Sequence, residues 1–122
     1  MSNADPSSQG PMTLSTHAVV LWVLRALPSQ EAAEALYLQS MVASIAGGPP
    51  TMLELEVPSS CEPAHIPDGP LPVRAVALDG QGRTVGEVLV WVSNGYLSTV
   101  EYAWYTDEAP TELPPTSQLR QE

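Results

Sequence analysis

The sequence predicts an α+β two-layer domain, with two N-terminal helices packed on one face of a mostly antiparallel sheet of about five strands. The main observation is the segment 85–105, in which two runs of β-branched and aromatic residues flank Asn94-Gly95. Asn-Gly is the dipeptide preferred in two-residue hairpin turns. Two helix-favouring segments precede this hairpin, and Gly and Pro clusters separate the shorter apolar runs.

The first two elements are predicted as helices. Residues 17–27 contain no helix breaker, and Ser15 or Thr16 can accept hydrogen bonds from the first free amides. The β-branched valines in this run leave a buried strand open as an alternative. Residues 31–39 are dense in Ala, Glu and Leu, and Ser29 is the expected N-cap. The apolar positions expected to lie on the sheet in the second helix are Ala32, Ala35, Leu36 and Leu38.

Shorter apolar runs predict the strands. Leu53 and Leu55 alternate with Glu54 and Glu56, which is typical of a strand with one buried and one solvent-exposed face. Both faces of residues 85–92 are largely apolar, so we expect this strand inside the sheet. The five prolines of residues 58–72 predict a long irregular loop. The expected strands are 41–45, 52–57, 73–78, 85–92 and the run that follows Gly95.

A two-residue loop at Asn94-Gly95 also predicts the register of the hairpin. One face would pair Val92 with Leu97, Val90 with Thr99 and Val88 with Glu101, and the other would pair Trp91 with Ser98, Leu89 with Val100, Glu87 with Tyr102 and Val85 with Trp104. This register places Glu101 on an apolar face, where a carboxylate needs a cation or amide donors. Arg74 on the neighbouring strand is the expected partner of Glu101.

The charge balance limits the partners. Lys and Arg total 4 against 14 Asp and Glu, which gives a formal net charge of −10. Affinity for nucleic-acid phosphates comes from Lys and Arg, so we expect no nucleic-acid partner. Anionic membrane surfaces are disfavoured on the same ground. A basic protein is the partner that this charge favours.

The predicted organisation is one domain over residues 14–122, after a disordered lead-in over residues 1–13 that is rich in Ser, Pro, Gly and Gln. Residues 1–4 resemble the remnant of an expression tag. The segment from Thr106 to the end is acidic and Pro-rich and is expected to lie over the surface of the domain.

The one cysteine, Cys61, cannot form an internal disulfide, which fits the reducing cytoplasm. The apolar run 18–24 is much shorter than the roughly 20 residues of a membrane span.

Two groups of residues could carry chemistry. The first is a set of carboxylates, which could act as general acid and base if two were held together, although solvated strand faces and an acidic tail are the simpler interpretation: Glu54, Glu56, Glu87, Glu101, Asp107 and Glu108. The second is Cys61 with His65 and His17, which offers too few ligands for a structural zinc and no positioned nucleophile. We therefore expect no metal and no cofactor.

The aromatic residues near the acidic end of the hairpin suggest a binding surface. Trp and Tyr are favoured interface residues, but half or more of them could equally lie in the core. The expected partner-binding residues are Trp104, Tyr105, Asp107, Glu108 and Tyr96. The favoured function is a non-enzymatic module that binds a basic protein, as an immunity protein or antitoxin binds a toxin. The alternatives are a small enzyme using carboxylates near Glu54 and Glu101, and a structural domain.

The C-terminal half resembles a known group of proteins. The resemblance rests on three segments, which are Leu53-Glu-Leu-Glu-Val-Pro58, Gly86-Glu-Val-Leu-Val-Trp-Val92 and Gly95-Tyr-Leu-Ser-Thr-Val-Glu-Tyr-Ala-Trp-Tyr-Thr-Asp-Glu108. Prolines follow the third segment. These segments are similar to a group of small uncharacterised bacterial proteins that end in Asp/Asn-Gly-x-Leu-Ser-x-Leu-Glu, aromatics, Asp-Glu and prolines. The resemblance implies a bacterial protein and a shared fold. It implies no activity.

Overall fold

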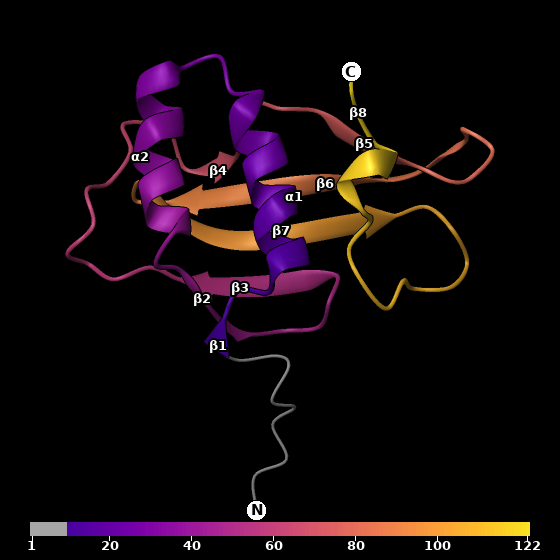
Figure 1. The fold of residues 1–122 in the computed structure, drawn as a ribbon, viewed down its shortest axis with the longest axis horizontal. Helices are drawn as coiled ribbons and strands as arrows, with labels where there is room; N and C mark the ends of the chain where they lie inside the picture. Colours follow the sequence, from indigo (N-terminus) through magenta and orange to yellow (C-terminus); the bar gives the residue numbers. More distant parts are fainter. Residues whose placement is uncertain (1–9) are drawn as a thin grey trace, which may run out of the picture.

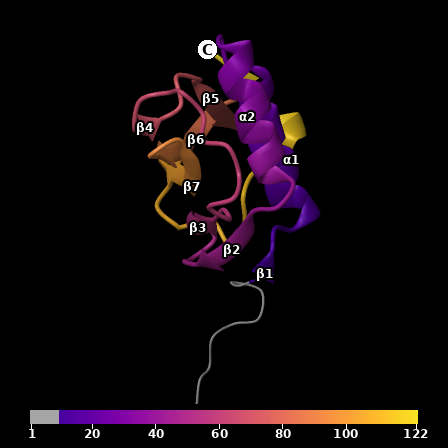
Figure 2. The same cartoon turned by 90° about the vertical axis from the view of Figure 1, so that its left-hand side faces the viewer.

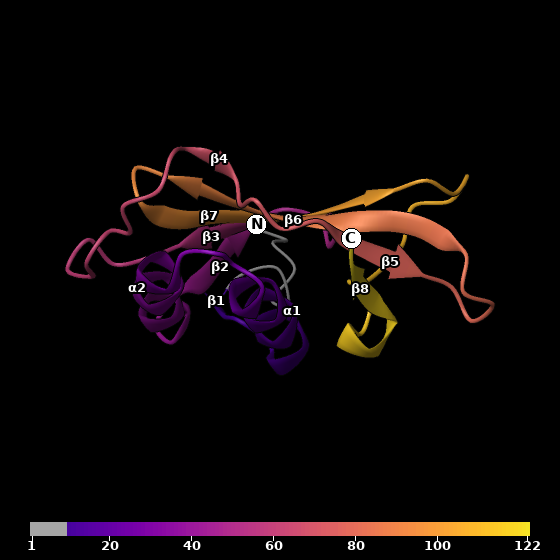
Figure 3. The same cartoon turned by 90° about the horizontal axis from the view of Figure 1, so that it is seen from above.

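Two helices lie side by side over one face of an antiparallel sheet (Figure 1). The structure is a computed structural model and describes residues 10–122. Within these residues the helices occupy one side of the sheet only (Figures 2 and 3). The predicted α+β class with helices on one face is confirmed, but the sheet has eight strands instead of about five.

The first helix, α1, spans Leu14–Arg25, so the alternative of a buried strand is wrong. Its N-cap is Thr13, whose side-chain oxygen accepts a hydrogen bond from the Thr16 amide at 3.2 Å. The predicted caps Ser15 and Thr16 therefore lie inside the first turn. The helix begins earlier than predicted because Thr13 supplies the same hydroxyl acceptor before the apolar residue Leu14.

The second helix, α2, spans Gln30–Ser40, and Ser29 caps it as predicted, by accepting a hydrogen bond from the Ala32 amide at 3.2 Å. Ala32 and Leu36 are buried against the sheet. Leu38, which was expected on the same stripe, is exposed because it lies two residues after Leu36, on the opposite side of the helix.

The sheet order is β1-β2-β3-β7-β6-β5-β8, and β4 also pairs with β6. Every pairing is antiparallel. The strand β6 lies between β7 and β5, so its predicted interior position is confirmed. The strands are β1 Gly10–Pro11, β2 Ser44–Gly47, β3 Met52–Glu56, β4 Gly69–Pro70, β5 Ala75–Leu78, β6 Thr84–Ser93, β7 Tyr96–Trp104 and β8 Leu119–Gln121.

Three short strands lie in segments where irregular chain was expected. The strand β1 takes the end of the predicted lead-in, whose residues 1–9 lie outside the described part of the chain. The strand β4 lies in the Pro-rich loop and pairs with β6. The strand β8 ends the tail and forms the sheet edge beside β5, after a short 3-10 helix, η2, at Thr116–Gln118. These strands are two or three residues long, which is too short to show a period in the sequence.

The hairpin of β6 and β7 keeps the predicted Val92–Leu97 pair and then departs from the predicted register. Trp91 pairs with Thr99, so Ser98 is an extra residue on β7 and forms a β-bulge. The predicted pairs beyond this point are therefore wrong by one residue. The observed pairs are Val90 with Val100, Leu89 with Glu101, Val88 with Tyr102, Glu87 with Ala103 and Gly86 with Trp104.

The bulge has a clear physical reason. A shift of one residue moves each following side chain of a strand to the other face. Without Ser98 as an extra residue, Glu101 would face the helices while Val100 and Tyr102 faced solvent. With the bulge, Val100 and Tyr102 are buried and Glu101 lies on the side away from the helices. The turn itself is as predicted, because Asn94 and Gly95 both have positive φ, 54° and 83°, as a type I′ turn requires.

The core lies between the helices and the inner face of the sheet. The longer strands contribute alternate residues to it, as the burial of Leu53 and Leu55 in β3 illustrates. Packing of these side chains against α1 and α2 is the main favourable contribution to folding. The most deeply buried apolar side chains of this core are Val19, Val20, Val23, Leu36, Val88, Val90, Val92, Leu97 and Val100.

Candidate functional site

Neither α1 nor α2 covers the sheet face that points away from them (Figure 3). We call it the open face. Its side chains follow from the alternation in β3, β6 and β7, together with the residue before β5. They are Met52, Glu54, Glu56, Arg74, Glu87, Leu89, Trp91, Thr99, Glu101 and Ala103. Val76 on β5 and Arg120 on β8 continue the row of Glu87 on the same face, and Val76 is buried there.

Glu101 pairs with a tryptophan and not with the predicted arginine. The indole Nε1–H of Trp91 donates a hydrogen bond to Oε1 of Glu101 at 2.9 Å. The guanidinium of Arg74 instead approaches Glu87, with Nε 3.8 Å from Oε2. The expected Arg74–Glu101 pair is therefore wrong. Both side chains lie on the open face, but β6 separates β7 from β5, so Glu87 on β6 is the carboxylate next to Arg74. The bulge places Glu101 on this face beside Trp91, where solvent and one indole donor satisfy the carboxylate.

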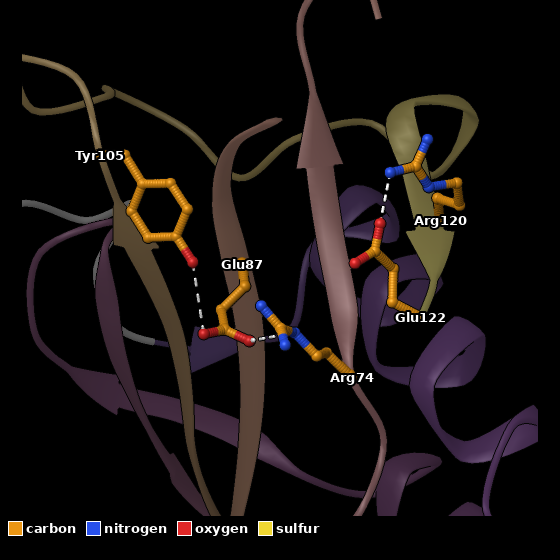
Figure 4. A network of polar contacts seen from close by, with 5 residues as sticks. All are labelled: Arg74, Glu87, Tyr105, Arg120 and Glu122. Carbon is orange, nitrogen blue, oxygen red and sulfur yellow. Dashed lines mark hydrogen bonds and ion pairs between the residues drawn. The ribbon is translucent and has the colours of Figure 1, made fainter. Parts of the chain in front are cut away.

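Tyr105 connects the end of β7 with the open face. Its hydroxyl donates to Oε1 of Glu87 at 3.4 Å, and its backbone amide donates to the carbonyl oxygen of Val85 at 2.9 Å. Figure 4 shows the carboxylate of Glu87 between Tyr105 and Arg74. A second ion pair, between Arg120 on β8 and Glu122, lies further along the same side of the sheet in this view.

Four of the five predicted partner-binding residues lie together at one end of the sheet. Trp104 and Tyr105 are 40% and 56% exposed, and Asp107 and Glu108 are exposed in the loop directly after β7. Tyr96 lies at the other end of β7, about 26 Å away at about 3.3 Å per residue. The structure therefore does not bring Tyr96 together with the other four.

Tyr96 has a structural contact of its own. Its hydroxyl donates a hydrogen bond to the carbonyl oxygen of Cys61 at 3.0 Å, which ties the start of β7 to the Pro-rich loop. The side chain is half-buried there. This contact accounts for a tyrosine at the position without any partner.

Three cavities on the described residues do not gather the carboxylates proposed for catalysis. One of about 470 Å³ lies between α1 and α2 and is lined by residues that include Leu21, Leu24 and Tyr37. A second of about 730 Å³ lies beneath the loop after β7, beside Asp107 and Glu108. The third, about 160 Å³, lies beside α1. Glu54, Glu56, Glu87 and Glu101 line none of the three.

Tyr102 lies at the wall of the second cavity and is nearly buried. Burial raises the pKa of its phenol above the ordinary tyrosine value. Tyr102 is thus a core residue at the base of this end of the sheet, whereas its neighbours Trp104 and Tyr105 reach solvent. The aromatic residues at this end of β7 are accordingly divided between core and surface.

The cysteine and the histidines lie in separate local contacts. His17 Nε2 is 3.1 Å from Ser40 Oγ, which joins α1 to the end of α2. His65 Nδ1 is 4.0 Å from Glu31 Oε1 at the surface. Residues 10–122 contain no group of three or more His, Cys, Asp or Glu side chains placed to hold a metal ion. These residues support no nucleophilic or metal site in the described part of the chain.

The helical layer carries an exposed apolar patch that the sequence interpretation missed. Leu14, Leu38, Met41 and Val42 are between 54% and 89% exposed. The His17–Ser40 contact places the start of α1 beside the end of α2, so these residues lie at the same end of the layer. Met41 and Val42 were assigned to a strand because they continue an apolar run. The only sequence signal for this patch was that Met41 and Val42 extend the apolar residues of the second helix beyond its buried positions.

Comparisons with protein families, with curated proteins and with solved structures find no match for this chain. The resemblance stated for the C-terminal half therefore stays a prediction. Within residues 10–122, neither helix has the length and apolar character needed to cross a bilayer.

Proposed function

We propose that this chain is a non-enzymatic protein-binding module that holds a basic protein on its open face and on the adjoining residues Trp104, Tyr105, Asp107 and Glu108. The observation that carries the proposal is the hydrogen bond from Tyr105 to Glu87. It places an exposed aromatic ring from the end of β7 against a carboxylate of the open face. This contact links the loop after β7 to the open face, whereas Trp104, two residues after the inward-facing Tyr102, lies at the sheet end on the helix side.

The charges on this surface favour a cationic partner. The open face carries Glu54, Glu56, Glu87 and Glu101 against two cations, Arg74 and Arg120. Each of these arginines already pairs with a carboxylate, Arg74 with Glu87 and Arg120 with Glu122. Asp107 and Glu108 extend the negative charge around the end of β7. Complementary charge accelerates the encounter of two proteins and disfavours partners of the wrong sign, nucleic acid included.

The shape of the surface favours a protein partner over a small substrate. An open sheet face with half-exposed Leu89, Trp91 and Tyr105 offers broad contact without enclosure. Aromatic residues within an acidic surround are typical of interfaces with basic proteins, of which inhibitor–nuclease pairs are one class. The proposal is of this immunity-like or antitoxin-like type, acting in the cytoplasm.

The proposal is tested by capture on immobilised protein from native lysate at low salt, followed by elution with salt. Each recovered protein is then purified and its Kd is measured by calorimetry at several salt concentrations. We expect one basic protein whose affinity falls as salt rises, because charge contributes to binding. Recovery of no basic protein, or of one whose affinity is insensitive to salt, would contradict the proposal.

Matched variants assign the binding to the surface. The variant Asp107→Asn with Glu108→Gln removes two charges from the proposed surface, and Glu31→Gln with Glu34→Gln removes two from α2 on the opposite layer. We expect the first pair to weaken Kd about tenfold and the second pair to change it less than about twofold. Equal weakening by both pairs would show that only net charge matters.

A further inference from the structure

Trp91 lies among carboxylates on the open face in a defined order. Across the sheet, Trp91 pairs with Thr99 on β7, and Thr99 pairs with Glu54 on β3. In the next row, Glu101 lies between Leu89 and Met52. Directly opposite and diagonal neighbours in a sheet lie within reach of long side chains. Trp91, Glu54 and Glu101 therefore surround the small side chain of Thr99.

The hydrogen bond to Glu101 fixes the indole ring. Nε1–H of Trp91 has a charged acceptor at 2.9 Å, and such charge-assisted bonds are stronger than neutral ones. The ring is half-buried, so it presents part of its surface to solvent. Aromatic faces attract cations, and Trp does so most strongly.

The carboxylates around this ring lack a cation of their own. Among the salt bridges of residues 10–122, none involves Glu54, Glu56 or Glu101. Oε1 of Glu101 accepts the indole proton, while Oε2 takes part in none of the hydrogen bonds found in this part of the chain. A cationic side chain stacked on the Trp91 ring would contact the aromatic face and also neutralise the carboxylates beside it.

We propose that Trp91, Glu101 and Glu54 form the subsite that receives an arginine side chain of the basic partner, an inference that rests on the proposed function. A guanidinium is planar, stacks on an aromatic ring and donates several hydrogen bonds at once to carboxylates. Trp91 provides the stacking face, and the carboxylates of Glu101 and Glu54 accept the guanidinium protons. Lysine, with a compact ammonium group, satisfies fewer of these contacts together.

The test uses a capped arginine octamer as the probe and ¹⁵N-labelled full chain at low salt. Two-dimensional spectra report the indole N–H of each tryptophan, and Trp91→Phe identifies the Trp91 signal. We expect the Trp91 indole signal and the amides around Thr99 to shift on titration and to return when salt is added. A lysine octamer should bind at least about threefold more weakly.

The decisive comparison is Glu101→Gln against Glu34→Gln. Glutamine at residue 101 retains an oxygen acceptor for the indole, so the ring position is kept while the charge is lost. Glu34 is exposed on α2, and its replacement changes the net charge by the same amount. We expect Glu101→Gln to weaken octamer binding about fivefold or more and Glu34→Gln to weaken it less than about twofold.

The outcomes separate this inference from the proposed function. If the octamer binds but shifts only residues near Asp107 and Glu108, the arginine subsite is wrong and the binding of a basic partner stands. Equal affinity for both octamers, or equal effects of both Gln variants, would overturn the arginine subsite alone. If neither octamer binds at low salt, both proposals fail.

Discussion

The side-chain amide of Gln39 donates a hydrogen bond to the carbonyl oxygen of Gly95 at 2.8 Å and so joins the end of α2 to the turn of the β6–β7 hairpin. The same amide donates to the carbonyl oxygen of Glu62 at 3.0 Å, and its oxygen accepts from the Leu97 amide at 2.9 Å. Gln39 is 0% exposed. One side chain thus fixes the helix, the Pro-rich loop and the hairpin that carries the open face.

Replacing Gln39 with Leu should strongly destabilise the fold. The substitution removes three hydrogen bonds and leaves buried backbone groups unpaired, which should cost about 2–4 kcal/mol of unfolding free energy. The exposed Gln30→Leu is the control and should change it by less than about 0.5 kcal/mol. Urea denaturation measures both. A loss below about 1 kcal/mol in Gln39→Leu would contradict the structural role of this amide.

A pair of glycine substitutions tests the packing of β6 on β7. A methyl group at Gly86 would lie 2.6 Å from the Ala103 carbonyl oxygen and 2.7 Å from Cε1 of Tyr102, so Gly86→Ala should cost about 2 kcal/mol or more. At Gly80 the same methyl group would meet no atom within 4 Å, so Gly80→Ala should be close to neutral. Thermal unfolding compares them. Similar unfolding temperatures for both variants would refute the close approach at Gly86.

The turn between β5 and β6 predicts a pH dependence. The backbone amides of Arg83 and Gln81 donate to Oδ1 of Asp79 at 2.9 and 2.8 Å, and Arg83 Nε donates to Oδ2 at 3.0 Å. The Arg83 amide above all, and then the Gln81 amide, lower the pKa of Asp79 below its ordinary value. A lowered folded-state pKa stabilises the protein above the unfolded-state pKa, and this contribution is lost as pH falls through the folded-state pKa.

The variant Asp79→Asn should therefore be less stable than the unmodified chain above about pH 4. The difference should shrink as the pH is lowered further, because the aspartate becomes neutral as well. Urea midpoints of both proteins between neutral and strongly acidic pH measure this. A difference that stays constant over the whole range would show that the charge of Asp79 contributes nothing.

Trp104 is an interface residue in this account. It is 40% exposed, so Trp104→Ala should cost less than the roughly 3–5 kcal/mol of a fully buried tryptophan and leave the domain folded. Binding of the captured basic protein should weaken about tenfold. Tyr37→Ala on α2, where the ring is 45% exposed, is the matched control and should bind normally. A folded Trp104→Ala variant with unchanged Kd would show that Trp104 is not part of the partner-binding surface.

Much of the fold could be predicted from the sequence, because caps, turns and strand alternation are local. Ser29 capped the second helix, and Asn94-Gly95 formed the predicted turn. The bulge at Ser98 could not be predicted, since a serine after a hydrophobic residue carries no local preference for an extra strand position. It arises because burying Val100 and Tyr102 requires a change of register.

The candidate site was predictable only in part. Trp104, Tyr105, Asp107 and Glu108 are close in sequence, so any strand ending there brings them together. The open face was missed because it depends on long-range pairing and on the bulge. The predicted register gave Glu101 an arginine partner, whereas the observed register gives it Trp91. Tyr96 is separated from the site by the length of β7.

Hydroxyl-radical footprinting of the complex with the captured basic protein tests most directly whether the open face is the binding surface. Residues 10–122 hold two exposed methionines on opposite layers, Met52 on the open face at 41% and Met41 at the end of α2 at 58%. Complex formation should slow the oxidation of Met52 and leave that of Met41 unchanged. Protection of Met41 with unchanged oxidation of Met52 would contradict the account and place the partner on the helical layer.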